Sequence, residues 1–180
     1  MTHWLERTEL LLGSEKTKRL QNARVLVVGL GGVGAYAAEM LARSGIGAYQ
    51  GWASGNPALP PMYDYISYYR DKTARWDFSR QADIVVINLG TNDLWTGGSS
   101  RALTQAMQDF MRQVRQKNPQ AKIVWAAGGI MADYLDEADD AVDSLGGPQK
   151  GYYVCPLPCG PNKGGNGHPT AEQHQSMADS

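Results

Sequence analysis

The sequence is poor in cysteine, in phenylalanine and in long hydrophobic runs, and charges of the two signs nearly balance. The 180 residues include 2 Cys and 2 Phe. Cys155 and Cys159 are too few for a disulfide framework or a cysteine-based zinc site, and whether they pair or remain free thiols is left open. With 17 Lys and Arg against 18 Asp and Glu, the chain lacks the basic excess of nucleic-acid-binding proteins. No apolar run is long enough to span a membrane.

The N-terminal residues carry no recognisable export signal. Met1 to Lys18 is rich in charge and lacks the apolar stretch and small-residue cleavage site of a secretory signal. We therefore expect a cytoplasmic protein. Its 42% of hydrophobic residues are enough for a buried core, while the composition does not predict an oligomeric state.

Short apolar runs rich in β-branched residues alternate with helical patterns. Arg24–Val28 (RVLVV), Asp83–Leu89 (DIVVINL) and Ala121–Ala127 (AKIVWAA) are typical of buried strands in a parallel sheet. The alternation predicts an α/β fold with a mainly parallel sheet. Helices are expected between Trp4 and Gln21, over Ala35–Arg43, from Ser100 as N-cap to Pro119, over Met131–Leu145, and after a capping box of Thr170 and Gln173; Tyr152–Leu157 is expected as a strand, and Gly45–Pro61 as largely irregular.

A glycine-rich turn follows the first predicted strand and opens the next predicted helix. Its sequence GLGGVG contains Gly29, Gly31, Gly32 and Gly34. Such a turn lets the backbone approach a phosphate, and the helix N-terminus adds amide donors and the positive end of its dipole. The pattern predicts nucleotide binding. A tight turn that only packs the strand on the helix is the alternative.

The segment Trp4–Gly47 around this turn resembles the start of the ThiF/MoeB/HesA family, ubiquitin-activating-enzyme-like proteins that include tRNA threonylcarbamoyladenosine dehydratases. The resemblance implies that ATP binds on the glycine-rich turn and that a carboxylate is adenylated. The chain departs from that family at Ala48–Trp52, where a second strand with an acidic end should follow, and the family's zinc cysteines are absent. An ATP-binding adenylating fragment is therefore an alternative function.

Two further motifs lie where catalytic residues of α/β enzymes are found. Gly90-Thr91-Asn92-Asp93 directly follows the strongest predicted strand, and ligands bind outside the carboxyl ends of strands in open α/β sheets. The Asn92 side chain there can donate to the oxyanion of an acyl-transfer intermediate. His168, in a predicted loop before the last helix, can act as a general base. Taken singly, an Asn-Asp turn or a lone histidine is more often structural.

Taken together, these motifs resemble the SGNH or GDSL-like hydrolases, and in particular the acetyl-xylan-esterase-like branch, the second carbohydrate-esterase family. Ile87–Asp93 (INLGTND) resembles the third conserved block, Gly165–Asp179 the last, and Ser44–Tyr65 the second block and its following loop. The resemblance implies a three-layer, flavodoxin-like fold and hydrolysis of acetyl or similar esters on carbohydrates through a serine acyl-enzyme, with no cofactor. It implies that Asn92 and the backbone N–H of Gly45 form the oxyanion hole, that His168 is the general base, and that Gly90 and Asp93 shape the oxyanion turn.

The serine nucleophile of that family has no counterpart here. The first block of the family is Gly-Asp-Ser at the end of the first strand, and no Gly-Asp-Ser occurs in the chain. The family's second strand is also predicted to be absent, because the helix ending at Arg43 runs straight into Ser44-Gly45. Ser44 and Ser54 are poor substitutes by position, and Gly165 replaces the Asp that many members use to orient the histidine. We therefore expect very weak hydrolysis at best.

The two resemblances meet near Ser44–Gly47, which predicts a composite chain. Residues 1–47 are expected to form a ThiF-like strand–loop–helix segment and residues 48–180 an SGNH-hydrolase-like domain, together one globular unit. The expected partner is a small-molecule or carbohydrate ester, with no nucleic acid and no membrane. A non-catalytic carbohydrate-binding α/β domain is the third interpretation.

Two groups of side chains have both a functional and a structural interpretation. Aromatic rings near the expected pocket can stack on sugars or simply pack. Acidic residues on the helix predicted over Met131–Leu145 lack the spacing of a calcium loop, which favours a solvated helix face and no metal. The aromatic group is Tyr49, Trp52, Tyr63, Tyr65, Tyr68, Tyr69 and Trp95, and the acidic group is Asp133, Asp136, Glu137, Asp139, Asp140 and Asp143.

Overall fold

A computed structural model describes most of the chain, which divides into two compact units. The boundary lies between Val85 and Val86, inside a strand, and the predicted domain boundary after residue 47 stays a prediction. Among the described residues, no helix is both long and apolar enough to cross a lipid bilayer. The described residues are 6–28, 47–51, 60–67, 71–90, 93, 99–128, 134–157 and 170–178.

The main sheet has the strand order β2-β1-β5-β6-β7. Strands β1 and β2 pair in parallel, and so do β6 and β7. The second strand lies outside the first and the later strands follow in chain order, as in flavodoxin-like folds. The prediction of an α/β fold with a mainly parallel sheet is therefore confirmed. The strands are β1 (Arg24–Val28), β2 (Gly47–Gly51), β5 (Ile84–Ile87), β6 (Lys122–Gly128) and β7 (Tyr152–Leu157).

Strand β2 corrects two of the predictions. Gly45–Pro61 was expected to be largely irregular and the second strand to be absent, yet Gly47–Gly51 forms a full parallel register with β1. The glycines at both ends give this segment a weak intrinsic preference for a strand. The strand forms because β1 offers a row of backbone donors and acceptors that need partners, and this pairing outweighs local propensity.

In the sequence of the first unit, two helices precede β1, and a 3-10 helix and two further strands follow β2. Helices α1 (Glu6–Leu12) and α2 (Ser14–Asn22) precede β1, as the helical pattern predicted. After the short 3-10 helix η1 (Pro60–Met62), strands β3 (Tyr65–Ser67) and β4 (Asp71–Arg75) form an antiparallel pair that was not predicted.

An aromatic cluster lies beside this antiparallel pair in the sequence. The ring of Phe78 lies 4.2 Å from that of Trp76 and 5.4 Å from that of Tyr63, measured between centroids. Tyr63 is buried. For Tyr63, the packing interpretation of the predicted aromatic group is therefore the correct one.

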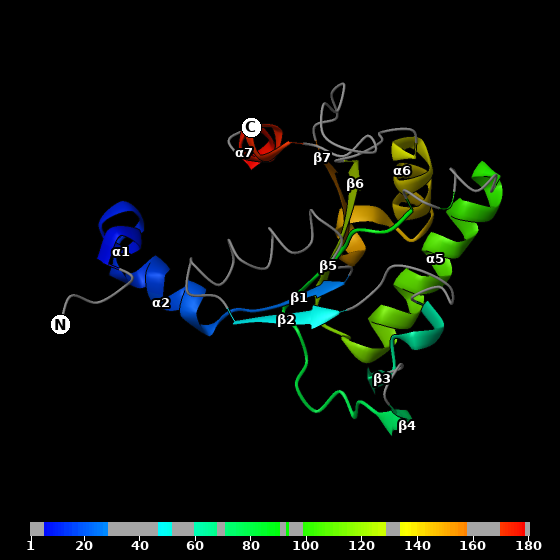
Figure 1. Ribbon diagram of the computed structural model, residues 1–180, viewed down its shortest axis with the longest axis horizontal. Coiled ribbons are helices and arrows are strands. Elements are labelled where there is room, and N and C mark those ends of the chain that lie inside the picture. Colours follow the sequence, from blue (N-terminus) through cyan, green and yellow to red (C-terminus); the bar gives the residue numbers. More distant parts are fainter. Residues whose placement is uncertain are drawn as a thin grey trace. The chain divides into compact units, whose positions relative to one another are not determined.

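The second unit is built on α5 (Ser100–Lys117). Its apolar residues recur at helical spacing and are buried. The N-cap is Ser99 and not Ser100 as predicted, because the Ser99 hydroxyl accepts from the N–H of Ala102 at 3.3 Å. Helices α5 and α6 (Leu135–Ser144) pack against each other and against β6 (Figure 1). The buried residues of α5 are Leu103, Met107, Phe110, Met111 and Val114.

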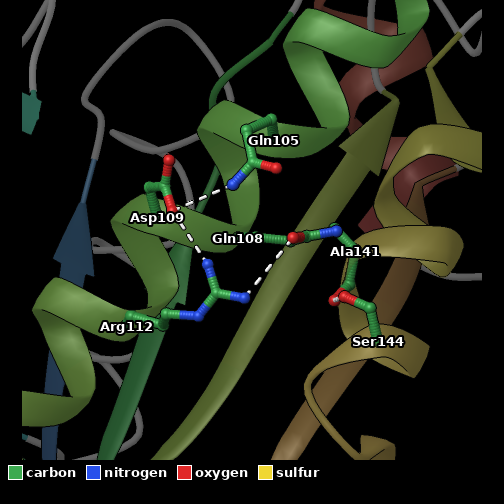
Figure 2. A network of polar contacts seen from close by, with 6 residues as sticks. All are labelled: Gln105, Gln108, Asp109, Arg112, Ala141 and Ser144. Atoms are coloured by element: carbon green, nitrogen blue, oxygen red, sulfur yellow. Dashed lines mark hydrogen bonds and ion pairs between the residues drawn. The ribbon is translucent and has the colours of Figure 1, made fainter.

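The exposed face of α5 carries polar pairs one helical turn apart (Figure 2). Asp109 Oδ1 accepts from Gln105 Nε2 at 3.1 Å and from Arg112 Nη1 at 2.8 Å. Arg112 Nη2 also donates to Gln108 Oε1 at 3.5 Å. Because pairs of this kind each contribute only about 0.2–0.5 kcal/mol, they support a helix whose position is set by its buried face.

The starts of the two later helices agree with the sequence to different degrees. Helix α6 begins at Leu135, later than predicted, because Tyr134 has the non-helical dihedrals φ −121° and ψ 18°. Helix α7 (Ala171–Ala178) begins with the predicted capping box. The N–H of Thr170 donates to Gln173 Oε1 at 3.0 Å, and the N–H of Gln173 donates to Thr170 Oγ1 at 3.3 Å.

Arg115 joins the end of α5 to the starts of β6 and β7. Its guanidinium lies 4.8 Å from the ring centroid of Tyr152 and donates to backbone carbonyls from two segments. A planar guanidinium spreads five donors over three nitrogens and so reaches carbonyls of two segments at once, whereas a lysine has three donors on a single nitrogen. The accepting carbonyls are those of Pro119 (3.1 Å), Ala121 (2.5 Å), Lys150 (3.0 Å) and Gly151 (3.1 Å).

Arg24 and Asp83 form an ion pair between the start of β1 and the residue before β5. Arg24 Nη2 lies 3.1 Å from Asp83 Oδ1, and Asp83 Oδ2 accepts from Arg24 Nε at 3.2 Å and from the Arg24 N–H at 2.9 Å. The side-chain hydrogen bonds of Arg24, with its backbone N–H and its charge, hold the pKa of Asp83 below its ordinary value of 3.8. The ionised carboxylate therefore stabilises the fold above that pH, and the contribution is lost as the pH falls through the lowered pKa.

We expect Asp83→Asn to lower the free energy of unfolding at pH 7 by less than about 1 kcal/mol, because half-exposed ion pairs are screened by solvent. The two side chains are 49% and 48% exposed. Urea unfolding of wild type and variant at a series of pH values would show the difference shrinking below pH 3.8. Asp139→Asn, on the exposed face of α6, is the control. A pH-independent difference, or an equal one in the control, would contradict this expectation.

Candidate functional site

The residues that follow β5 are fixed by hydrogen bonds to β6. Asn88 Nδ2 donates to the carbonyl of Ala126 at 2.8 Å. Trp125 Nε1 donates to the carbonyl of Leu89 at 3.2 Å. Ligands bind outside the carboxyl ends of strands in open α/β sheets. These two bonds therefore hold the backbone in place directly before the predicted oxyanion motif.

Gly90 begins a turn at a position that only glycine fits. Its φ is +117°, and a Cβ added there would lie 3.3 Å from Met107 Cε and 3.3 Å from Tyr134 Cδ2. The N–H of Asp93 donates to the carbonyl of Gly90 at 3.1 Å, and the Asp93 side chain is exposed. In the sequence, the two positions enclosed by this hydrogen bond are Thr91 and Asn92.

Tyr134 packs against Gly90 and holds the end of β6. The residue is 1% exposed. Its hydroxyl accepts from the N–H of Gly128 at 3.0 Å and donates to the carbonyl of the same residue at 3.5 Å. Tyr134 is not among the predicted site residues, because the sequence pattern predicts a helix over Met131–Leu145 that includes it. A single tyrosine between the end of a strand and an acidic helix was the signal that could have found it.

Most of the predicted site residues lie outside the part of the chain that the structure describes. Gly90 and Asp93 are described, and one hydrogen bond joins them. The proposed catalytic roles of the others, and nucleotide binding at the glycine-rich turn, stay predictions. The residues outside the described part are Asn92, His168, Gly45, Gly29, Gly31, Gly32 and Gly34.

Strand β2 is the described element that follows Gly45 in the sequence. Gly47 pairs with Arg24, the first residue of β1, so β2 starts at the amino end of its neighbour. Gly51 pairs with Val28, and the chain leaves the carboxyl end of β2 with the next residue. Gly45 itself lies outside the described residues, so its predicted role in the oxyanion hole stays a prediction.

The described residues contain no group of three or more His, Cys, Asp or Glu side chains placed to hold a metal ion.

Glu137 on helix α6 is buried, with 8% of its surface exposed. The prediction that the acidic face of α6 is solvated is therefore wrong for this residue. Glu137 lies one helical turn before the buried Ala141, so both occupy the inner face of α6. It lines a groove of about 540 Å³ between α5 and α6. The acidic residues of α6 that are exposed are Asp136, Asp139, Asp140 and Asp143.

We expect Gly90→Ala to lower the free energy of unfolding more than Gly13→Ala does. Gly13 also has a positive φ, +82°, but a Cβ there would have nothing within 4 Å. The control therefore carries only the backbone strain, of about 1–2 kcal/mol, whereas at Gly90 the close contacts with Met107 and Tyr134 add to it. Urea unfolding of both variants measures the difference. Equal losses would mean that packing at Gly90 contributes nothing.

The chain is similar in fold to carbohydrate esterases of known structure. An acetyl xylan esterase from Butyrivibrio proteoclasticus matches with a TM-score of 0.69 at 18% identity, over 88% of this chain and 62% of that one. A family two carbohydrate esterase from Clostridium thermocellum, in complex with cellohexaose, matches with a TM-score of 0.70 at 24% identity, also over 88% and 62%. The chain thus spans less than two thirds of either esterase.

A second similarity is short and stronger in sequence. Over 47 residues the chain is 53% identical to the tRNA threonylcarbamoyladenosine dehydratase of Bacillus subtilis. The matching segment is 26% of this chain and 18% of that protein.

The family comparison covers nearly the whole chain. The model of the GDSL-like lipase/acylhydrolase family matches residues 16–179, a range that contains β1, the turn Gly90–Asp93 and His168. The chain therefore belongs to the GDSL-like lipase/acylhydrolase family.

Proposed function

We propose that this chain is an ester hydrolase of the carbohydrate-esterase type whose activity is reduced by the loss of its serine nucleophile. The observation that carries the proposal is the family match over residues 16–179, which includes a turn anchored at the end of a central strand. The folds of two carbohydrate esterases, one of them an acetyl xylan esterase, support acetylated sugars as the substrate class.

The proposed chemistry assigns a separate role to each predicted residue. The Asn92 side chain donates to the oxyanion that forms when the ester carbonyl is attacked. His168 takes the proton of the attacking group and returns it to the leaving alcohol. In the family the attacking group is a serine hydroxyl after the first strand. Here Gly29-Leu30-Gly31 follows β1, so no hydroxyl stands at that place in the sequence.

The proposal predicts that the nucleophile can be restored by changing two residues. We expect Leu30→Asp combined with Gly31→Ser to raise hydrolysis of p-nitrophenyl acetate by at least about tenfold over wild type, since a nucleophile acting with a base dominates such rates. The release of p-nitrophenol measures the rate. Adding His168→Ala to this double variant should remove the gain.

A matched control separates chemistry from a change in shape. Leu30→Asp with Gly31→Ala introduces the same charge and almost the same bulk without a hydroxyl, so it should stay at the wild-type rate. If wild type is already active and His168→Ala abolishes that activity, another serine serves and the proposed impairment is wrong. If the double variant stays inactive while cellohexaose binds to the chain, a non-catalytic carbohydrate-binding role is the better account.

Nucleotide binding is the second candidate, favoured by the 53% identity over 47 residues with a dehydratase. It predicts a saturable heat when ATP and Mg²⁺ are titrated into the chain in a calorimeter, because a glycine-rich turn before a helix binds phosphate. Gly32→Asp should abolish this heat, since a carboxylate in the turn repels phosphate. A flat wild-type titration would rule this candidate out.

A further inference from the structure

We propose that Tyr134 is a positioning residue that sets the place of the turn from Gly90 to Asp93. The inference deepens the proposed function and rests on it in one respect, which is that Asn92 in this turn meets the substrate. Tyr134, Gly90, Met107 and Gly128 all belong to the described part of the second unit.

Tyr134 links the ends of two neighbouring strands with one rigid side chain. Its ring atoms Cδ2 and Cε2 would lie 3.3 Å and 3.4 Å from a Cβ at Gly90, the residue that opens the turn after β5. Its hydroxyl accepts from the N–H of Gly128, the last residue of β6. Because the side chain is 1% exposed, water cannot take over the hydroxyl's role at Gly128.

The kind of contact changes along the segment that leads to the turn. Asn88 and Leu89 are held by hydrogen bonds to β6. At Gly90 the contact becomes close packing, so that a methyl group there would force Tyr134 to shift by a few tenths of an ångström. Close-packed interiors transmit displacements and do not absorb them. A movement of the ring would therefore move Gly90 and the residues that follow it.

Met107 touches the same place but is less able to define it. A methionine side chain has three rotatable bonds and adapts to its neighbours. The tyrosine ring has two side-chain torsions, and its far end is fixed at Gly128. Tyr134 therefore determines the position and Met107 fills the remaining space. For an oxyanion donor, a misplacement of about 1 Å can cost about 100-fold in rate, so such a support has a functional consequence.

The first test reads the turn without any assay of activity. The backbone-amide and Asn side-chain NMR signals of the ¹⁵N-labelled chain are compared among wild type, Tyr134→Leu, Tyr134→Phe and Tyr152→Leu. Tyr134→Leu should move the Asn92 side-chain signal and speed exchange of the Asp93 N–H by about tenfold, because the turn loses its support. Tyr134→Phe keeps the ring but loses the bond to Gly128, so it should disturb Gly128 and move the Asn92 signal less than Tyr134→Leu does.

Tyr152→Leu is the matched control. Tyr152 is also a buried tyrosine, but it pairs with Ile123 near the start of β6, away from the end at Gly128. Its loss should leave the Asn92 and Asp93 signals in place. Unchanged signals in Tyr134→Leu, or an equal change in Tyr152→Leu, would overturn the proposal. Should Tyr134→Leu fail to fold, Tyr134→Met is read by the same two signals.

The second test measures whether the position of the turn affects the rate of hydrolysis. In the variant that carries Leu30→Asp and Gly31→Ser, Tyr134→Leu should lower kcat for p-nitrophenyl acetate by about tenfold or more with little change in KM, because only oxyanion stabilisation is lost. A displaced Asn92 signal with an unchanged kcat would overturn the positioning role. If the variant that carries only Leu30→Asp and Gly31→Ser has no activity, the proposed function fails. The Asn92 and Asp93 signals still decide whether Tyr134 holds the turn.

Discussion

The packing of Tyr134 between Gly90 and Gly128 is the constraint on which the turn after β5 and the end of β6 depend. Gly90, after β5, has a φ of +117°, and Gly128, at the end of β6, has a φ of +110°. A side chain at either position would be strained, so glycine occupies both the end of β6 and the turn after β5. Tyr134 fills the space at Gly90 with its ring and satisfies the backbone of Gly128 with its hydroxyl. One side chain thereby fixes how two neighbouring strands end.

The amino ends of the strands are held by a different kind of interaction. Within the second unit, Arg115 donates to carbonyls before β6 and before β7. Within the first unit, Arg24 and Asp83 join the starts of β1 and β5 by charge and by four hydrogen bonds. Both interactions lie at the amino ends of strands, whereas in this class of sheet the carboxyl ends bind the ligand.

The sequence predicted the elements whose signal is local. Strands β1, β5, β6 and β7 and helix α5 each have a run or a period of apolar residues that is sufficient by itself. Strand β2 was missed because its stability comes from pairing with β1, which composition does not record. The cap at Ser99 and the start of α6 were misplaced by a few residues, because a helix boundary depends on individual hydrogen bonds.

The candidate site divides along the same line. Gly90 and Asp93 could be named from the sequence because a short motif contains both. Tyr134 could not, because it lies more than forty residues later and acts through a ring contact that only the folded chain makes. Motifs identify the groups that meet a substrate. The residues that hold those groups in position follow from packing, and packing has no sequence pattern of its own.

The loss of activity proposed for this chain would separate fold from activity at one strand. The family match begins at residue 16, and the ThiF-like resemblance runs from Trp4 to Gly47, so both include β1. Strand β1 buries Val25, Leu26 and Val27. It can therefore pack in the sheet whatever turn follows it. The chemistry of a GDSL-like hydrolase depends instead on the residues directly after the strand, where Gly-Leu-Gly stands in place of Gly-Asp-Ser. A sheet that accepts either turn can keep its architecture without the serine, as the proposed function requires.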